Sequence, residues 1–405
     1  MEKIISLVGL FVMIGVSYAL SENRKNIQWR TVISGVLLQI VFGLIILKTS
    51  FGREVFDSIG RGFNSILGFT AEGAKFLFGG LATPSDSLGF IFATMVLPTI
   101  IFMSSLMSVL YHIGFMQKVV EVVARVMMKF MKTSGAESLA AAANIFVGQT
   151  EAPLVIKPYV GQMTKSELMC LMTGGMATVA GGVLAAYVGF GIDAGHLLAA
   201  SVMSAPAALV CSKLMVPEME ESVTAGVVSV DLPKVSANVI DAAATGASDG
   251  LKLAVNVAAM LLSFIALIAM LNGILGWTGS LVGFDGLSFE LIMGYVNAPV
   301  AWLLGVPWED CLKVGSILGK KLVLNEFVGY LDLIAAKDQI SERSTIITTY
   351  ALCGFSNFSS IAIQLGGIGT MAPEKRPTLA QYGMKALIGG TLACYMTACI
   401  AGLFI

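Results

Sequence analysis

Two glutamates, each beside amide or hydroxyl groups, are the residues of this sequence best suited to bind a solute. Glu151 follows Gln149 and Thr150, and Glu326 follows Asn325. Both lie among apolar residues, where a carboxylate is costly unless it is paired, hydrated or protonated. Carboxylates beside amides and hydroxyls suit a solute with many hydrogen-bond donors, such as sugar hydroxyls or nucleobase N–H groups. We therefore treat the two glutamates as candidate ligands of a polar solute.

The segments that carry these glutamates, residues 143–153 and 321–328, have apolar flanks too short to cross a bilayer. The simplest geometry is a helical hairpin that enters and leaves the membrane on the same side, with the polar residues at its tip. Irregular backbone at membrane depth is tolerated only where it lines a cavity or is buried in protein. We predict two such re-entrant hairpins.

Each predicted hairpin is followed by an apolar segment that is interrupted near its middle. Gly181 and Gly182 interrupt the first segment, and Asn357, Ser359 and Ser360 interrupt the second. A helix can unwind at such places and expose carbonyl groups. A hairpin followed by a broken helix thus occurs twice, as expected of an inverted-repeat transporter with its binding site at the repeat interface.

Structural interpretations of the same residues remain open from the sequence alone. Glu151 could pair with Lys157, and Glu326 with Lys321, inside the protein. The asparagine and serines of the second break could only link helices to one another. Phe355 could be a packing residue, although its place one turn from that cluster favours a stacking role.

Composition places these motifs in a membrane protein. The chain has 405 residues, of which 56% are hydrophobic and 13% charged, whereas soluble domains carry about 25% charged residues. Its net charge of -1 gives no field that would attract nucleic acid. The six cysteines show no CxxC spacing and the two histidines stand alone, which argues against a metal cluster. We predict an all-α polytopic membrane protein.

A spanning helix needs about 20 apolar residues. We predict eight spans, at residues 4–20, 32–47, 90–111, 172–189, 197–215, 253–275, 346–365 and 386–405. Three amphipathic segments are predicted to lie at the membrane interface, at residues 51–80, 116–131 and 287–304. The polar stretch 217–250 is predicted to be a cytoplasmic connecting loop.

Positive charges in short loops indicate the orientation, because they favour the cytoplasmic side. The loop after the first predicted span holds Arg24, Lys25 and Arg30, and the loop before the last holds Lys375 and Arg376. Both loops are therefore predicted to be cytoplasmic. With eight spans, both termini would be periplasmic in a bacterial inner membrane.

Three motifs in this order resemble the concentrative nucleoside transporter family in its bacterial eight-span form. They are Gly-Gln-Thr-Glu-Ala-Pro at 148–153, Asn-Glu-Phe at 325–327 and Gly-Phe-Ser-Asn-Phe-Ser-Ser at 354–360. The resemblance covers essentially the whole chain. It implies a homotrimer in which a transport part moves like an elevator against a scaffold and takes up nucleosides such as uridine with a cation.

The same resemblance implies roles for individual residues. The nucleobase would face Gln149, Thr150, Glu151 and Val183. The ribose would bind Glu326, Asn357 and Ser360, with Phe355 lining the pocket. A sodium ion would be held by Asn144, Val147, Thr178 and Val179, an amide, a hydroxyl and backbone carbonyls. Many members have serine in place of Thr178, and the hydroxyl is retained here.

The resemblance also implies a division of the chain. Residues 1–130 would be mostly scaffold, 131–190 the first hairpin and broken helix, and 191–305 two spans with the loop and an interfacial helix. Residues 306–370 would be the second hairpin and broken helix, and 371–405 the last span.

Competing functions are less consistent with these motifs. Proton coupling through Glu151 or Glu326 is the nearest alternative to sodium coupling. An enzyme would need a nucleophile beside a base, and neither histidine lies in the polar motifs. A channel would need a continuous polar path, whereas the polar groups here are confined to two tips and two breaks. We predict a symporter that is not an enzyme and needs no cofactor beyond the coupling ion.

Overall fold

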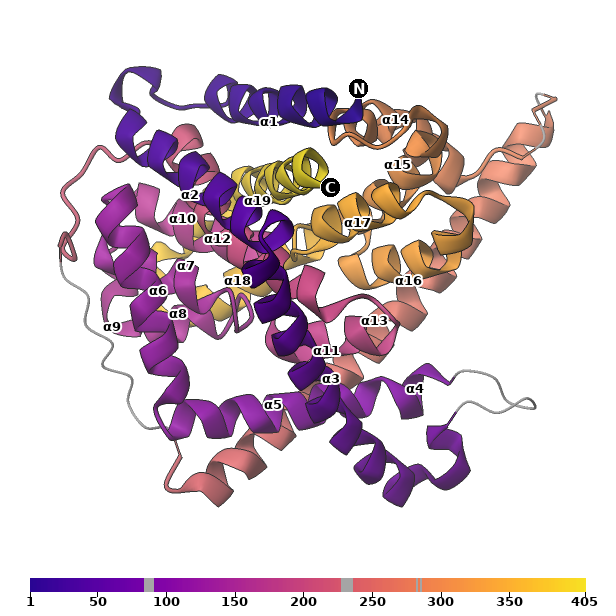
Figure 1. Ribbon diagram of the computed structural model, residues 1–405, viewed down its shortest axis with the longest axis horizontal. Helices are drawn as coiled ribbons and strands as arrows, with labels where there is room; N and C mark the ends of the chain where they lie inside the picture. Colours follow the sequence, from indigo (N-terminus) through magenta and orange to yellow (C-terminus); the bar gives the residue numbers. More distant parts are fainter. Residues whose placement is uncertain (84–90, 227–235, 282, 285) are drawn as a thin grey trace.

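The computed structural model describes residues 1–83, 91–226, 236–281, 283–284 and 286–405, and its regular elements in this part of the chain are helices (Figure 1). The α-helices are α1 (Glu2–Ala19), α2 (Trp29–Lys48), α3 (Ser50–Phe78), α4 (Phe92–Met95), α5 (Leu97–His112), α6 (Phe115–Met131), α7 (Gly135–Ala143), α8 (Ala152–Val155), α9 (Lys157–Val160), α10 (Lys165–Ala177), α11 (Gly181–Gly189), α12 (Ala194–Met215), α13 (Val239–Leu281), α14 (Phe289–Leu303), α15 (Trp308–Val323), α16 (Glu326–Ala336), α17 (Glu342–Leu352), α18 (Phe358–Met371) and α19 (Arg376–Phe404). Short 3₁₀ turns cover Arg24–Asn26, Gly79–Ala82, Lys337–Gln339 and Pro373–Lys375. The predicted all-α architecture is confirmed.

Among the described residues, seven helical segments are long and apolar enough to cross a membrane. They are Glu2–Ala19, Trp29–Lys48, Phe92–His112, Lys165–Gly189, Ala194–Met215, Val239–Leu281 and Pro373–Phe404. The pair α14 and α15, bent by 118°, would be an eighth. The predicted span 346–365 is instead divided between α17 and α18, so the predicted set of eight is not confirmed. Residue 90, where one predicted span begins, lies outside the described residues.

The predicted loop 217–250 is wrong in its second half, because α13 already begins at Val239. The Asn238 side chain accepts a hydrogen bond from the backbone N–H of Asp241 at 2.9 Å, an N-cap interaction that starts the helix. Polar residues suggested a loop there, but Asp241 and Asp249 lie on the helix. Residues 227–235 of the predicted loop lie outside the described part.

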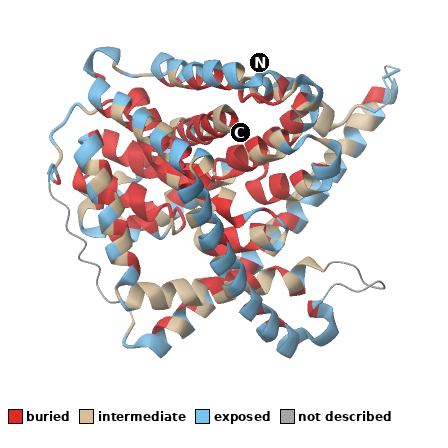
Figure 2. Cartoon of the chain, in the orientation of Figure 1, coloured by how far each residue is buried: buried red, intermediate tan, exposed pale blue. Residues whose placement is uncertain are grey.

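The core of the protein surrounds α12 and α19. In their most apolar windows, 89% of the α12 residues and 78% of those in the segment containing α19 are buried, compared with 11% for α13. Helices α1, α2, α10 and α17 pack around this pair, and Figure 2 shows the buried residues concentrated there. Helix α13 is therefore peripheral and presents a largely apolar surface.

Helices α5 and α13 pack closely along a ladder of small residues. A Cβ atom built on Gly246 would lie 2.6 Å from Cβ of Ser108, and one built on Gly250 would lie 2.8 Å from Cβ of Ser104. Such small-residue contacts let membrane helices approach each other closely. In Figure 1, α5 lies along the bottom of the molecule, and α13 starts there and runs up its right side.

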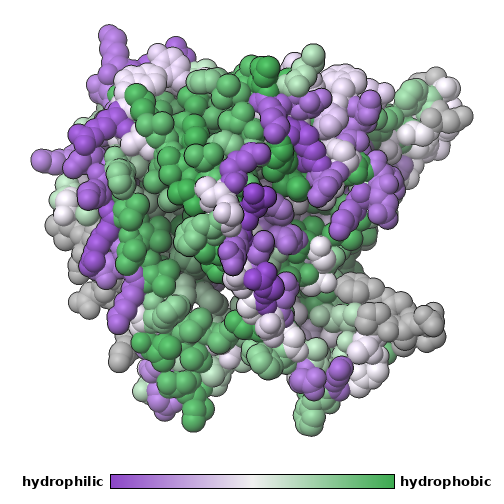
Figure 3. Space-filling view, in the orientation of Figure 1, coloured by the Kyte–Doolittle hydropathy of each residue, from purple (hydrophilic) through white to green (hydrophobic). Residues whose placement is uncertain are grey.

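The three predicted amphipathic segments correspond to the helices α3, α6 and α14. On the face in Figure 3, hydrophobic residues cover a broad area, and hydrophilic residues gather along the left edge and near the centre. The central group coincides with α3 in Figure 1, whose Arg53, Asp57 and Arg61 are exposed. That these helices lie at a membrane interface stays a prediction.

Both termini lie close together on one side of the molecule (Figure 1). Arg343 connects them, since its guanidinium group donates to the carbonyl of Gly402 at 2.6 Å and to the hydroxyl of Ser6 at 3.3 Å. The opposite ends of α1 and α19 also meet, because the Tyr382 hydroxyl donates to the Glu22 carboxylate at 3.1 Å. The two positively charged loops thus share one side.

Candidate functional site

The first predicted hairpin tip is an irregular segment between α7 and α8. A capping box starts α7, in which Ser134 and Glu137 each bond the backbone of the other. The helix ends at Ala143, and the chain stays irregular until Ala152 begins α8. Pro153 in the first turn of α8 suits a helix start, where its missing N–H costs nothing. The predicted tip therefore coincides with a real interruption.

The second predicted tip is a sharper interruption between α15 and α16. Helix α15 ends at Val323, and α16 begins at Glu326. The Asn325 side chain caps α16 by accepting a hydrogen bond from the N–H of Val328 at 3.0 Å. This cap fixes Glu326 in the first helical turn, where it is buried.

The two broken helices separate at residues 178–180 and 353–357. The prediction that Gly181 and Gly182 unwind was wrong, because they begin α11. The N–H of Gly181 instead donates to the carbonyl of Phe146 in the first tip at 3.0 Å, and the N–H of Phe355 donates to the carbonyl of Thr178 at 3.2 Å. Backbone groups at the breaks are therefore satisfied by other irregular segments, which brings these segments together.

Glu326 accepts two hydrogen bonds from the broken helices. Its Oε1 accepts from the Tyr187 hydroxyl at 2.9 Å, and its Oε2 accepts from Nδ2 of Asn357 at 3.1 Å. The Asn357 Oδ1 atom caps α18 by accepting from the N–H of Ser360 at 3.0 Å. The cap holds the Asn357 oxygen at the start of α18, and the amide nitrogen therefore points toward Glu326.

The alternative pairing of Glu326 with Lys321 is not formed. The buried Lys321 ammonium group donates to the carbonyl of Ala351 at 2.8 Å, near the end of α17. Cations are favourable near the C-terminus of a helix, where the carbonyl dipoles point outward. Lys321 thus stabilises the helix before the second break.

Gln149 lies in a second hydrogen-bonded cluster. Its Nε2 donates to the Ser360 hydroxyl at 3.0 Å, and its Oε1 accepts from Nε2 of Gln364 at 3.0 Å. Gln364 also donates to the carbonyl of Met172 at 2.9 Å. The structure therefore brings Gln149 of the first tip beside Ser360 of the second broken helix.

Three predicted solute ligands remain, which are Thr150, Val183 and Phe355. Val183 is buried in α11, and Phe355 is partly buried. A Cβ atom built on Gly367 would lie 2.9 Å from Cγ2 of Thr150, so Thr150 packs directly on α18.

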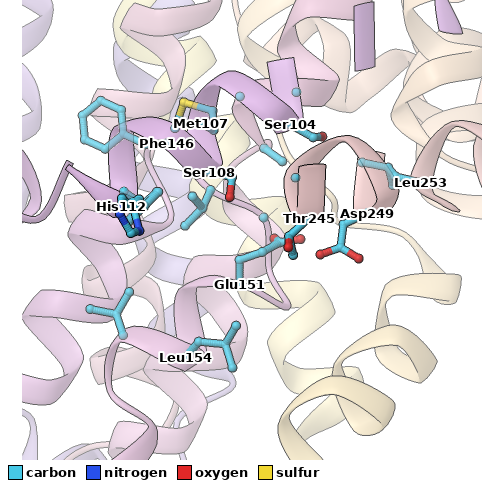
Figure 4. A pocket seen from close by; sticks show the side chains of 18 of the residues that line it. Ser104, Met107, Ser108, His112, Phe146, Glu151, Leu154, Thr245, Asp249 and Leu253 are labelled. Atoms are coloured by element: carbon cyan, nitrogen blue, oxygen red, sulfur yellow. The ribbon is translucent and has the colours of Figure 1, made fainter. Parts of the chain in front are cut away.

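Glu151 faces a separate cavity of about 390 Å³ between the first tip, α5 and α13 (Figure 4). Asp249 and Thr245 of α13 lie near Glu151 in this cavity, and Ser104 and Ser108 of α5 line it too. Lys157 forms no ion pair with Glu151 within the described residues. The structure thus places Glu151 apart from the Glu326 cluster.

Two of the predicted sodium ligands, Asn144 at the first tip and Thr178 at the first break, both lie near Gly174 of α10. Both polar side-chain atoms of Asn144 are buried with no hydrogen-bond partner among the described residues. A Cβ atom on Gly174 would lie 3.2 Å from Nδ2 of Asn144, and the Thr178 hydroxyl donates to the carbonyl of Gly174 at 2.9 Å. The buried amide oxygen and nearby hydroxyl and carbonyls are hard ligands of the kind an alkali cation takes.

Three family models match consecutive parts of the chain. A Na+ dependent nucleoside transporter N-terminus matches residues 8–81, a nucleoside recognition (Gate) model matches 93–194, and a Na+ dependent nucleoside transporter C-terminus matches 196–402. The chain belongs to the concentrative nucleoside transporter family. It is a multi-pass membrane protein of a family that transports nucleosides.

Similar proteins cover the whole transporter chain. An uncharacterized transporter of Bacillus subtilis is 48% identical over 406 residues, with full coverage of both chains. Sodium/nucleoside cotransporter 1 of Mus musculus is 45% identical over 418 residues, and the match covers 99% of this chain but 64% of that protein. A structure of CNTnw in an inward-facing substrate-bound state has a TM-score of 0.95 at 44% identity, covering 100% of this chain and 98% of that one.

Three polar residues near the site of this concentrative nucleoside transporter were not predicted from the sequence. Tyr187 contacts Glu326, Gln364 contacts Gln149, and Asp249 shares a cavity with Glu151. Gln364 offered a signal, because it is an amide within the otherwise apolar segment 361–368. Tyr187 offered none, since tyrosine is common in apolar segments.

Proposed function

We propose that this transporter is a sodium-coupled symporter that takes up nucleosides across a bacterial inner membrane. Sodium coupling is supported chiefly by the Asn144 side chain, which is buried with neither polar atom hydrogen-bonded among the described residues. A buried amide in this state costs free energy unless a ligand satisfies it. A sodium ion on its oxygen, with the Thr178 hydroxyl and the carbonyls of Val147 and Val179, would supply that partner.

The same proposal assigns the two hydrogen-bonded clusters to the nucleoside. Glu326 and Asn357 would bind ribose hydroxyls. A carboxylate accepts hydrogen bonds from hydroxyl groups, and an amide N–H donates to their oxygens. Gln149 would face the base and Ser360, which it bonds, the ribose. Thr150, Val183 and Phe355 would shape the space. In this structure these groups bond one another, and a nucleoside would bind to the donor and acceptor positions that these bonds leave free.

The cavity beside Glu151 suggests how the site is reached. One wall is the first tip, and the other is formed by α5 and α13. These two helices pack against each other more extensively than against the core. We propose that this pair belongs to the static scaffold and that the tips and broken helices move past it as an elevator. The chain division and the homotrimer predicted from the sequence belong to the same proposal, as do periplasmic termini.

Proton coupling is a second candidate because Glu151 lines the cavity and forms no ion pair within the described residues. A carboxylate open to a cavity inside a membrane protein can serve as a proton relay. In that case a proton gradient would replace the sodium gradient as the driving force.

Uptake of labelled uridine into proteoliposomes tests the proposal. We expect a sodium gradient to drive accumulation and a proton gradient alone to fail. Thr178→Val should raise the sodium concentration for half-maximal uptake about tenfold, since a charge-assisted contact is lost. Thr348→Val is the matched control, because Thr348 is also buried and bonds the carbonyl four residues earlier. Full uptake driven by protons without sodium would refute sodium coupling.

A further inference from the structure

Two residues assigned to nucleoside binding are each held by a side chain from the opposite repeat. Glu326, at the second tip, accepts from Tyr187 of the first broken helix at 2.9 Å. Gln149, at the first tip, accepts from Gln364 of the second broken helix at 3.0 Å. The two contacts therefore cross between the repeats in opposite senses.

The positions of these residues correspond in the two broken helices. Tyr187 is the seventh residue of α11 and Gln364 the seventh of α18. Val183 and Ser360, both assigned to the nucleoside site, are the third residues of the same helices. Residues at i and i+4 lie on one face of a helix. Each broken helix thus presents one site residue and, one turn further, one residue that bonds the other repeat's tip.

We propose that Tyr187 and Gln364 are positioning residues of the nucleoside site, which orient the Glu326 carboxylate and the Gln149 amide from the opposite repeat. The inference rests on the proposed function and deepens it. Neither residue needs to touch the nucleoside, because each acts through the residue that it bonds.

Tyr187 is suited to this role because its ring is fixed. It is fully buried, and its ring centroid lies 4.9 Å from that of Phe327 and 4.4 Å from that of Tyr330. Its hydroxyl and the Asn357 amide hold different oxygens of Glu326. A carboxylate has about four lone-pair positions, so two stay free for ribose hydroxyls in a fixed plane.

Gln364 fixes which end of Gln149 acts as a donor. Its Nε2 donates both to Oε1 of Gln149 and to the carbonyl of Met172. The Gln149 oxygen is therefore occupied, and its Nε2 is directed toward Ser360. Gln149 would present an N–H donor to the base, which favours bases with a carbonyl acceptor at that position.

The Tyr187 test is Tyr187→Phe against Tyr330→Phe, compared by calorimetric binding of uridine and 2′,3′-dideoxyuridine to the purified protein with sodium. Tyr330 is also buried, and its hydroxyl donates to the carbonyl of Thr349 at 2.9 Å. Tyr330→Phe therefore loses a comparable buried hydrogen bond that does not involve Glu326. We expect Tyr187→Phe to weaken uridine binding about tenfold and to reduce the preference over the dideoxy compound. Tyr330→Phe should keep the wild-type preference. An unchanged preference in Tyr187→Phe, or an equal loss in both variants, would overturn the inference.

If Tyr187→Phe does not fold, 3-fluorotyrosine at position 187 keeps the ring and makes the hydroxyl a stronger donor. The ribose preference should then change while thermal stability stays near wild type, and no change would count against the role. For Gln364, we expect Gln364→Met to change the ratio of uridine to adenosine affinity at least threefold. Gln39→Met is its control, because buried Gln39 donates to the Thr397 hydroxyl at 2.9 Å away from the tips.

The proposed function and this inference fail in different ways. A wild-type protein that binds no nucleoside in sodium would refute the function itself. A wild-type protein that binds uridine, with all selectivity ratios unchanged in the Tyr187 and Gln364 variants, would refute only the positioning roles.

Discussion

The ammonium group of Lys213 lies 2.8 Å from Oε2 of Glu137 and 3.1 Å from Oε2 of Glu218. Lys213 lies in the last turn of α12, Glu137 lies in the first turn of α7, and Glu218 follows α12. The first two side chains are buried, and Lys213 also donates to the Ser166 hydroxyl at 3.0 Å. This ionic cluster connects the base of the first hairpin to the core.

Removing the cation of this cluster should destabilise the protein. Lys213→Met would leave two carboxylates without their partner, and breaking a buried ion pair costs about 3–5 kcal/mol of unfolding free energy. Equilibrium unfolding in mixed micelles measures the change. Lys75→Met, which removes an exposed lysine 3.9 Å from Glu72, should cost less than about 1 kcal/mol. Equal stability of the two variants would contradict the role of the cluster.

Glu326→Gln and Asn357→Ala should abolish uridine uptake while the protein stays folded. Glu326→Gln removes the negative charge and replaces one acceptor oxygen by an N–H donor. Asn357→Ala removes the amide that we assign to the ribose and its bond of 3.1 Å to Glu326. Uptake into proteoliposomes and the elution profile in detergent are the measurements. Asn297→Ala is the control, since Asn297 bonds a carbonyl of its own helix. Normal transport by both site variants would disprove the ribose assignment.

Asp249→Asn should raise the sodium concentration that gives half-maximal uptake, by about two- to threefold, and leave the maximal rate unchanged. Glu151 and Asp249 face one cavity whose low-dielectric walls focus their field on cations. Lys252 lies 3.0 Å from Asp249 and offsets part of that field, so the expected effect is small. The comparison is Asp241→Asn, two turns earlier on α13, whose carboxylate bonds the N–H of Ala237. If both variants behave alike, the cavity does not collect the coupling ion.

Gly246→Leu should lower both stability and uptake, because its side chain would meet Ser104 and Ser108 of α5. Forcing a large residue into a close-packed contact typically costs about 1–3 kcal/mol. Gly273→Leu lies on the same helix with no atom within 4 Å of the new Cβ and should be tolerated. Thermal unfolding in detergent measures both, and a stable Gly246→Leu variant would disprove close packing of α5 on α13.

The sequence predicted the features that depend on local chemistry. The tips at 144–151 and 324–325 were located because polar residues interrupt apolar runs, and the structure has breaks there. The length of α13 was not predicted, because Asp241, Thr245 and Asp249 suggested a loop although they lie on a helix with small residues along one face. A helix that borders a cavity can carry polar residues, so polarity alone did not indicate a loop here.

Contacts between distant residues were beyond the sequence pattern. The bond between Tyr187 and Glu326 joins residues 139 positions apart, and nothing in the local sequence of either one indicates the other. The alternative partner Lys321 was closer in sequence but bonds Ala351 instead. Composition and spacing identified which groups need partners, whereas the fold determined which partners they found.

The crossed bonds from Tyr187 to Glu326 and from Gln364 to Gln149 have a consequence for how such a protein can arise. A single half of the chain would expose a tip whose partner belongs to the other half. An ancestral half-length polypeptide would therefore form both contacts only by pairing with a second copy of itself. Fusion into one gene would then fix the pairing and let each half diverge, so that one came to carry a phenol and the other a carboxamide at the matching place.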